Sequence, residues 1–214
     1  ADLLAVLSDF GPSDPAWSVT ESLAEFEAGC SDCGEECAPQ PVLLGGEGIE
    51  ASYGYDTPCG SGTAAVLVRV DRDGASTSAT ALTDWNGDCC AGVGNGFIAV
   101  ATELRFVVHR PVAVAYEASC EVICAFGGPC TGPFWVSFNG PGVSLMGPGS
   151  IDQVLEPGAY FIGAESYTLE ACPLTEIVTS AYSIVFEEPR SVSDVDEDGA
   201  VDLDDVLAVI ADWS

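Results

Sequence analysis

The chain has 214 residues, of which 34 are acidic and only five are basic, all of them arginine, so its formal net charge is -29. Nucleic acid and anionic membranes are poor partners for such a surface, whereas divalent cations and neutral or basic surfaces suit it. No apolar run of about 18 residues occurs that could span a bilayer. This length allows one sizeable domain with short appendages.

The first predicted element is a short amphipathic helix over residues 2–10, within a terminal segment 1–12, and it repeats residues 205–213. The identical pairs are Asp2 and Asp205, Leu4 and Leu207, Ala5 and Ala208, Val6 and Val209, and Asp9 and Asp212. Two unrelated helices would be the alternative interpretation. Because a short helix is marginal on its own, each copy is expected to need a partner.

Residues 13–189 are expected to form a disulfide-rich antiparallel β-sandwich of the jelly-roll type. The sequence predicts strands over residues 18–27, 49–55, 64–70, 76–83, 97–109 (bent or split), 112–118, 134–138, 143–146, 159–168 and 182–187. Apolar residues alternate in several of them, as at Phe134, Val136 and Phe138. Each of the three asparagines precedes glycine, the dipeptide that tight hairpin turns favour.

Ten cysteines accompany a single histidine. An even number of cysteines without histidine ligands indicates disulfides, five if all pair, and therefore a secreted, extracellular or cell-surface protein. Cys30, Cys33 and Cys37 could instead belong to a zinc site, or the first two to a redox motif, but neither is accompanied by the usual context. The disulfide connectivity is not readable from the sequence.

No catalytic motif is present, so we expect no enzymatic activity and assign no catalytic residue. His109 precedes Arg110 and Pro111 and is interpreted as a strand-end residue, since no nucleophile elbow or zinc-protease helix occurs. A pair of glycosidase carboxylates is not excluded, because acidic residues are so numerous. Candidate sugar-stacking residues are Trp85, Trp135, Tyr53 and Tyr55, although Trp135 alternates like a packed residue. The acidic turns Asp71/Asp73 and Asp84/Asn86/Asp88 fit plain hairpins better than calcium sites.

The C-terminal segment 190–214 contains a predicted calcium loop. The ligands would be Asp194, Asp196, Asp198, the carbonyl of Ala200, Asp202 and Asp205. Oxygen ligands at this spacing, with Gly199 at the turn, allow twelve residues to surround one calcium ion. A helix is predicted to follow, with Val206, Val209, Ile210 and Trp213 on one apolar stripe. A solvated acidic tail is the simpler alternative.

A loop followed by a helix, with Asp at its twelfth position and no preceding helix, resembles one repeat of a type I dockerin, a module with EF-hand-type calcium loops. Two such repeats normally pack together and bind a cohesin domain. The N-terminal helix would be a second, partial copy. Leu203 and Asp204 stand where cohesin-binding dockerins often carry Ser and Thr. Residues 104–186 also resemble, in architecture, a secreted bacterial β-sandwich of an adhesive, stalk or carbohydrate-binding kind.

The sequence therefore predicts an extracellular structural protein, with calcium as cofactor. Its two terminal helices could pair within one chain, pair head-to-tail between copies and form a filament or surface layer, or bind a cohesin-like domain. The alternative function is a carbohydrate-binding or enzyme-associated module anchored through a dockerin-cohesin interaction.

Overall fold

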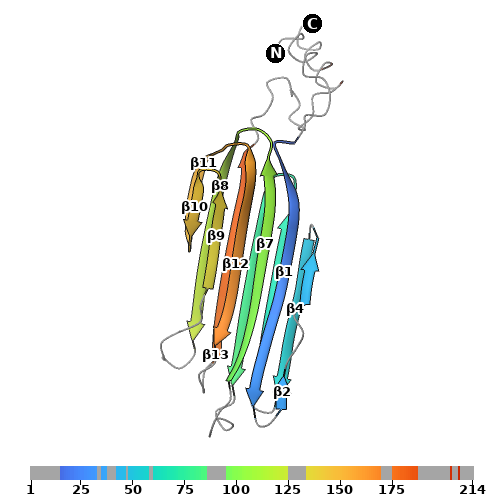
Figure 1. Ribbon diagram of the computed structural model, residues 1–214, viewed down its shortest axis with the longest axis vertical. Coiled ribbons are helices and arrows are strands. Elements are labelled where there is room, and N and C mark those ends of the chain that lie inside the picture. Colours follow the sequence, from blue (N-terminus) through green and yellow to red (C-terminus); the bar gives the residue numbers. More distant parts are fainter. Residues whose placement is uncertain are drawn as a thin grey trace.

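The fold is an antiparallel β-sandwich, as predicted, with two long sheets packed face to face (Figure 1). It is seen in a computed structural model that describes residues 15–32, 35–37, 42–46, 48–57, 60–85, 95–124, 134–169 and 175–187, together with Leu203 and Leu207. The rest of the predicted terminal segments, 1–12 and 190–214, lies outside these residues.

The described residues form thirteen strands. They are β1 (Trp17–Asp32), β2 (Glu35–Cys37), β3 (Val42–Gly45), β4 (Gly48–Thr57), β5 (Gly60–Val70), β6 (Gly74–Trp85), β7 (Asn95–Val108), β8 (Val112–Cys124), β9 (Phe134–Gly140), β10 (Val143–Met146), β11 (Gly149–Leu155), β12 (Gly158–Leu169) and β13 (Thr175–Glu187).

The larger sheet has the strand order β10-β9-β12-β7-β1-β2, and β3 also pairs with β1. The second sheet has the order β11-β8-β13-β6-β5-β4. From β6 to β13, every connection except the β9-β10 hairpin passes from one sheet to the other. This interleaving of the two sheets resembles a jelly roll, in which consecutive strands also lie in opposite sheets.

Every predicted strand is present, and the structure adds several that were not predicted. The segment expected to be bent or split is one continuous strand, β7, which ends before His109. The short strands β2 and β3 and the edge strand β11 were missed, and β13 starts seven residues earlier than predicted. In β11, GSIDQVL shows no clear apolar alternation. In the added part of β13, two of the three buried positions are the polar residues Glu176 and Ser180, so its apolar pattern is weak as well.

The interior of the sandwich divides into two clusters of different composition. The first is rich in aromatic rings, including Trp17, Phe106, Phe138, Tyr160 and Phe186. The second contains five alanines among its buried residues, with Phe26 as its largest side chain. Since alanine buries little apolar surface, the second cluster gains less free energy from the hydrophobic effect.

Next to the alanine-rich cluster, polar side chains bridge the sheets. The hydroxyl of Ser166 on β12 donates a hydrogen bond of 2.8 Å to the carbonyl of Ala79 on β6. The hydroxyl of Ser180 on β13 donates one, also of 2.8 Å, to the carbonyl of Glu165 on β12. Both serines are fully buried. A short side chain can reach the opposite backbone only where the sheets approach closely, so the sandwich is thin in this region.

The strand directions give the sandwich two distinct ends. At the first, called the terminal end, β1 begins and β13 finishes, and the register places Trp17 and Gly158 opposite Val108. At the opposite end, called the far end, the register joins Ser31 to Asn95 in one sheet and Thr175 to Asp84 in the other.

The cysteines are distributed unequally between these ends. The connections that leave the far end, 33–34, 58–59, 86–94, 125–133 and 170–174, carry Cys33, Cys59, Cys89, Cys90, Cys130 and Cys172. Cys30 and Cys37 lie opposite each other on β1 and β2, each two strand residues from the 33–34 connection. Cys124 is the last residue of β8, and Cys120 lies four residues before it. The four cysteines on described strands thus lie toward the far end, and the other six belong in the sequence to connections between strands that end there.

Candidate functional site

The terminal end positions the two predicted dockerin-like segments. Trp17, the first residue of β1, stacks on Phe186 near the end of β13, with ring centroids 4.0 Å apart and an angle of 14° between the planes. Both rings are buried. Residues 1–14 and 188–214 therefore leave the sandwich from adjacent points, although they are almost 170 positions apart along the chain.

Backbone hydrogen bonds fix both of these points. The amide of His109, in the β7-β8 turn, donates to the carbonyl of Ala16 at 2.8 Å. The amide of Phe186 donates to the carbonyl of Asp73, in the β5-β6 turn, at 2.8 Å. The start of β1 is thus tied to the turn that connects β7 to β8 across the two sheets, and the end of β13 is tied to the β5-β6 hairpin.

The predicted calcium ligands lie outside the described residues. They are Asp194, Asp196, Asp198, Ala200, Asp202 and Asp205. Within the described ranges, no group of three or more His, Cys, Asp or Glu residues is arranged to hold a metal ion. Leu203 and Leu207 are helical and 60% and 52% exposed. Residues four apart on a helix share a face, so these leucines form an exposed apolar pair.

The acidic turn between β5 and β6 is a plain hairpin, as predicted. The carboxylate of Asp71 accepts hydrogen bonds from the amides of Asp73 and Gly74, both at 3.0 Å. Such an Asx turn uses the carboxylate within the turn itself. In the second acidic turn, the structure describes Asp84, whose carboxylate accepts a 2.7 Å hydrogen bond from the Thr175 hydroxyl.

His109 has a partner that the sequence did not indicate. Its Nε2 lies 2.8 Å from the hydroxyl oxygen of Ser18, 91 positions away. His109 is exposed, in the turn that follows β7, as expected for a strand-end residue. The contact between Ser18 and His109 is exposed to solvent, so the pair is a surface hydrogen bond.

A β-bulge sets the side chains on the outer face of the larger sheet. The register between β1 and β7 shifts between Val19 and Glu21. The extra residue, Thr20, donates a 3.1 Å hydrogen bond from its hydroxyl to the carbonyl of Arg105. A bulge changes which residues face outward, and here it places Glu21 beside Arg105.

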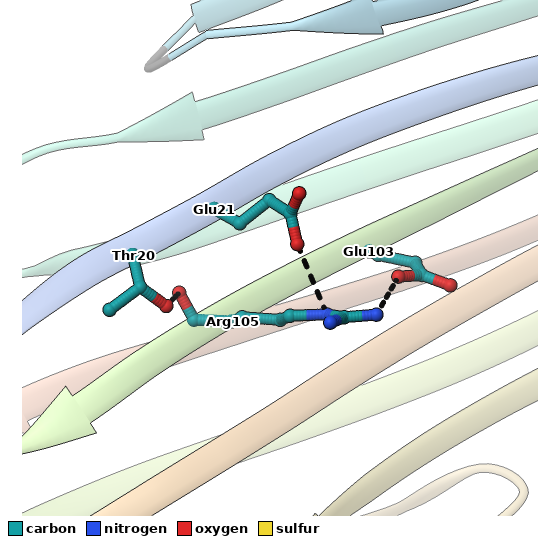
Figure 2. Close-up of polar contacts among 4 residues, drawn as sticks. All are labelled: Thr20, Glu21, Glu103 and Arg105. Carbon is teal, nitrogen blue, oxygen red and sulfur yellow. Dashed lines mark hydrogen bonds and ion pairs between the residues drawn. The ribbon is translucent and has the colours of Figure 1, made fainter.

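Arg105 is the centre of a small charged cluster (Figure 2). Its guanidinium lies 3.3 Å from a carboxylate oxygen of Glu21 and 3.0 Å from one of Glu103. The same group lies 5.9 Å from the ring centre of Phe161 on β12. Because the cluster is half exposed, these ion pairs contribute little to stability. They hold Arg105 in place between two carboxylates and an aromatic ring.

Aromatic rings continue along this outer face. The ring centroid of Trp135 on β9 lies 6.4 Å from that of Phe161. Both rings lie over Gly163, because a Cβ added to this glycine would be 2.6 Å from a ring atom of Trp135 and 3.0 Å from one of Phe161. Further along β12, Tyr167 lies 5.5 Å from Phe97. Burial, and then the carboxylates of Glu27 and Glu165, raise the pKa of Tyr167. We call Trp135, Phe161, Phe97 and Tyr167, with these neighbouring carboxylates, the aromatic face.

The other sugar-stacking candidates are only partly supported. Tyr53 packs against the core, 6.1 Å from Phe26, and the ring of Tyr55 lies over Gly62. The side chain of Trp85 lies outside the described residues. Trp135 is half-buried and belongs to the aromatic face described above, which the sequence did not reveal, because its members come from three strands.

Cys120 is the cysteine whose side chain the structure describes, and its thiol is free. The sulfur lies 3.8 Å from the hydroxyl oxygen of Ser180. Burial raises the pKa of Cys120, so the thiol is protonated at neutral pH and is a poor nucleophile. The predicted disulfides therefore stay predictions.

Comparisons with protein families, curated proteins and solved structures find no match to this chain. In the described part of the chain, no helix is long and apolar enough to cross a membrane.

Proposed function

We propose that the protein is a secreted structural subunit, in which a long β-sandwich is joined to a larger assembly through a calcium-dependent dockerin-like module at its terminal end. The protein has no catalytic role in this proposal. The stacking of Trp17 on Phe186 is the observation that carries it. This contact brings the attachment points of the two dockerin-like segments together.

Adjacent attachment points favour pairing of the two helices within one chain. Short flexible linkers give two tethered groups an effective concentration of about millimolar. A second copy at micromolar concentration competes poorly with such a tethered partner. The sandwich is then an insertion between the two halves of one module, and the partner of the closed module is a cohesin-like domain.

Calcium would supply the energy that closes the module. The carboxylates of Asp194, Asp196, Asp198, Asp202 and Asp205 and the carbonyl of Ala200 provide the oxygen ligands that this ion prefers. Without the ion, these carboxylates repel each other, in a chain of net charge -29. Binding neutralises them and orients the following helix toward residues 2–10.

Light scattering tests which pairing occurs. We expect the chain to keep its mass of 22.0 kDa both with calcium and with a chelator, because closure is internal. Calcium should nevertheless reduce its hydrodynamic radius, and Asp194→Ala should abolish this compaction. Large species that require calcium and disappear in Asp194→Ala would instead establish head-to-tail assembly between copies. A hydrodynamic radius that does not respond to calcium would contradict pairing within one chain and head-to-tail assembly alike.

The aromatic face supports glycan binding as a second candidate function. Aromatic rings beside carboxylates offer stacking surfaces and hydrogen-bond acceptors to a neutral sugar. Trp135 and Phe161 lie side by side on the outer surface, next to Glu165 and Glu103. We expect Trp135→Ala to abolish binding of the intact chain to a polysaccharide array. Phe134→Ala is the control, since Phe134 is 41% exposed but adjacent on β9 and therefore directed to the other side.

A further inference from the structure

The hairpin formed by β1 and β2 places two cysteines opposite each other. In this antiparallel pair the register joins Cys30 to Cys37, Ser31 to Glu36, and Asp32 to Glu35. Directly opposite Cα atoms in such a pair are about 4.5 or 5.5 Å apart, and their positions share one face of the sheet. Both distances lie within the range of about 4.4–6.8 Å that a disulfide spans.

Cys33 is the competing partner, because it is closer to Cys30 in the sequence. β1 continues in extended conformation from Cys30 to Asp32. Two strand residues advance the chain by about 6.6 Å, so Asp32, which precedes Cys33, already lies near the upper limit of the Cα separation that a disulfide spans. The register therefore favours Cys37 over Cys33, a choice that the spacing of cysteines in the sequence leaves open.

We propose that Cys30 and Cys37 form a cross-strand disulfide that fastens β2 to β1 at the far end of the sandwich. A low-molecular-weight disulfide such as oxidised glutathione is the oxidant. One cysteine thiolate attacks it, which forms a mixed disulfide and releases one glutathione thiolate. The second cysteine thiolate then attacks the mixed disulfide and displaces the other glutathione. The two protons lost by the cysteines are taken up by the two glutathiones.

The position of the hairpin gives this bond a structural role. β2 has only three residues and lies at the edge of its sheet, where it pairs with one neighbour. The adjacent interior is the thin, alanine-rich cluster, which provides little apolar burial to hold an edge strand. A covalent link fixes the register of such a short strand. This inference does not depend on calcium or on the proposed connector.

Peptide mapping of the intact, non-reduced protein tests the proposal directly. The protein is first equilibrated with oxidised glutathione, free thiols are blocked at low pH, and the chain is cleaved after Glu and Asp. Cleavage separates Cys30 on AGCSD (28–32), Cys33 on CGE (33–35) and Cys37 on CAPQPVLLGGE (37–47). We expect a linked pair of the first and third peptides, which reduction separates.

Two variants complete the design. Cys33→Ser should keep the linked pair, whereas Cys30→Ser should remove it and leave the Cys37 peptide free or linked elsewhere. Circular dichroism shows whether each variant keeps its β-structure. The proposal is overturned if the wild-type digest links Cys30 to Cys33 or to a cysteine of another connection. It is also overturned if Cys30, Cys33 and Cys37 are all blocked as free thiols, with or without stoichiometric zinc.

Discussion

At the residue scale, glycine allows aromatic rings to lie directly against the backbone. Gly140, the last residue of β9, faces the ring of Tyr160 so closely that an added Cβ would overlap it. The Tyr160 hydroxyl donates a 2.8 Å hydrogen bond to the carbonyl of Glu156, and the Pro141 carbonyl is 3.2 Å away. Tyr160 belongs to the aromatic cluster and cannot move without disturbing its neighbours.

We therefore expect Gly140→Ala to lower the free energy of unfolding by about 1–3 kcal/mol, the usual cost of overpacking. Gly48→Ala is the matched control, because nothing lies within 4 Å of its added Cβ. Urea denaturation of both variants measures the difference. Equal unfolding midpoints for Gly140→Ala and wild type would show that the Tyr160 ring is not held against Gly140.

Two buried tyrosines link stability to alkaline pH. Burial raises the pKa of Tyr116 and of Tyr182 above the usual tyrosine value of 10.0. Each folded tyrosine stays neutral at a pH at which the unfolded chain ionises. Their contribution to stability is thus complete below pH 10 and is lost as the pH rises above it.

Unfolding free energies measured from pH 8 to 12 should be constant up to about pH 10 and then fall. Each of the two tyrosines accounts for up to about 1.4 kcal/mol per pH unit. The double variant Tyr116→Phe/Tyr182→Phe should show a shallower decrease at high pH, whatever its stability at pH 8. If the unfolding free energy falls equally steeply with pH in the wild type and in the double variant, these tyrosines are not the cause of the decrease.

At the scale of elements, β1 and β13 hold the terminal end together, although they belong to different sheets. Trp17 on β1 also makes an edge contact with Phe106 on β7, with centroids 6.2 Å apart. Phe186 on β13 lies 5.3 Å from Phe106. The three rings close the aromatic cluster at the end of the sandwich where the described part of β1 begins and β13 finishes.

Phe186→Ala should cost about 3–5 kcal/mol, as large truncations in a core do. It should also separate the two attachment points and reduce the compaction that calcium causes. The neighbouring change Val185→Ala removes a side chain that is 45% exposed and should cost less than about 1 kcal/mol. Thermal denaturation measures the first effect and hydrodynamic radius the second. If folded Phe186→Ala still becomes more compact when calcium is added, the contact between Trp17 and Phe186 is not needed for that compaction.

The strands were predictable where one face is apolar and the other polar. Phe134–Gly140 and Gly158–Leu169 were placed to within two residues, since their apolar residues alternate. β11 was missed because it is an edge strand with little apolar content, and the start of β13 because Ser180 and Glu176 stand at buried positions. Burial of hydroxyl groups depends on where the opposite sheet lies, and no local pattern records that.

The surface sites were less predictable than the strands. Ser18 and His109 are 91 positions apart, and the bulge at Thr20 that aligns Glu21 with Arg105 leaves no signal in the sequence. The aromatic face likewise combines rings from β7, β9 and β12. By contrast, the predicted calcium loop, which lies outside the described residues, rests on spacing alone, because all its candidate ligands come from one short segment.

At the scale of the whole molecule, the predicted calcium-binding segment and most cysteine-containing connections adjoin opposite ends of the sandwich. The terminal end carries the aromatic cluster and the attachment points of the two predicted dockerin-like segments. The far end carries the strand ends next to the cysteine-containing connections. We expect calcium to control the first end and thiol oxidation the second, independently of each other.

Calorimetric titration of calcium into the intact chain tests the central claim most directly. If residues 2–10 complete the module, one calcium should bind per chain, and Leu7→Asp on the apolar face of the first helix should weaken binding by about tenfold or more, or about 1.4 kcal/mol. Ser8→Asp, which adds the same charge off that face, should bind calcium like wild type. No calcium binding, or equal affinity in Leu7→Asp and wild type, would contradict the account.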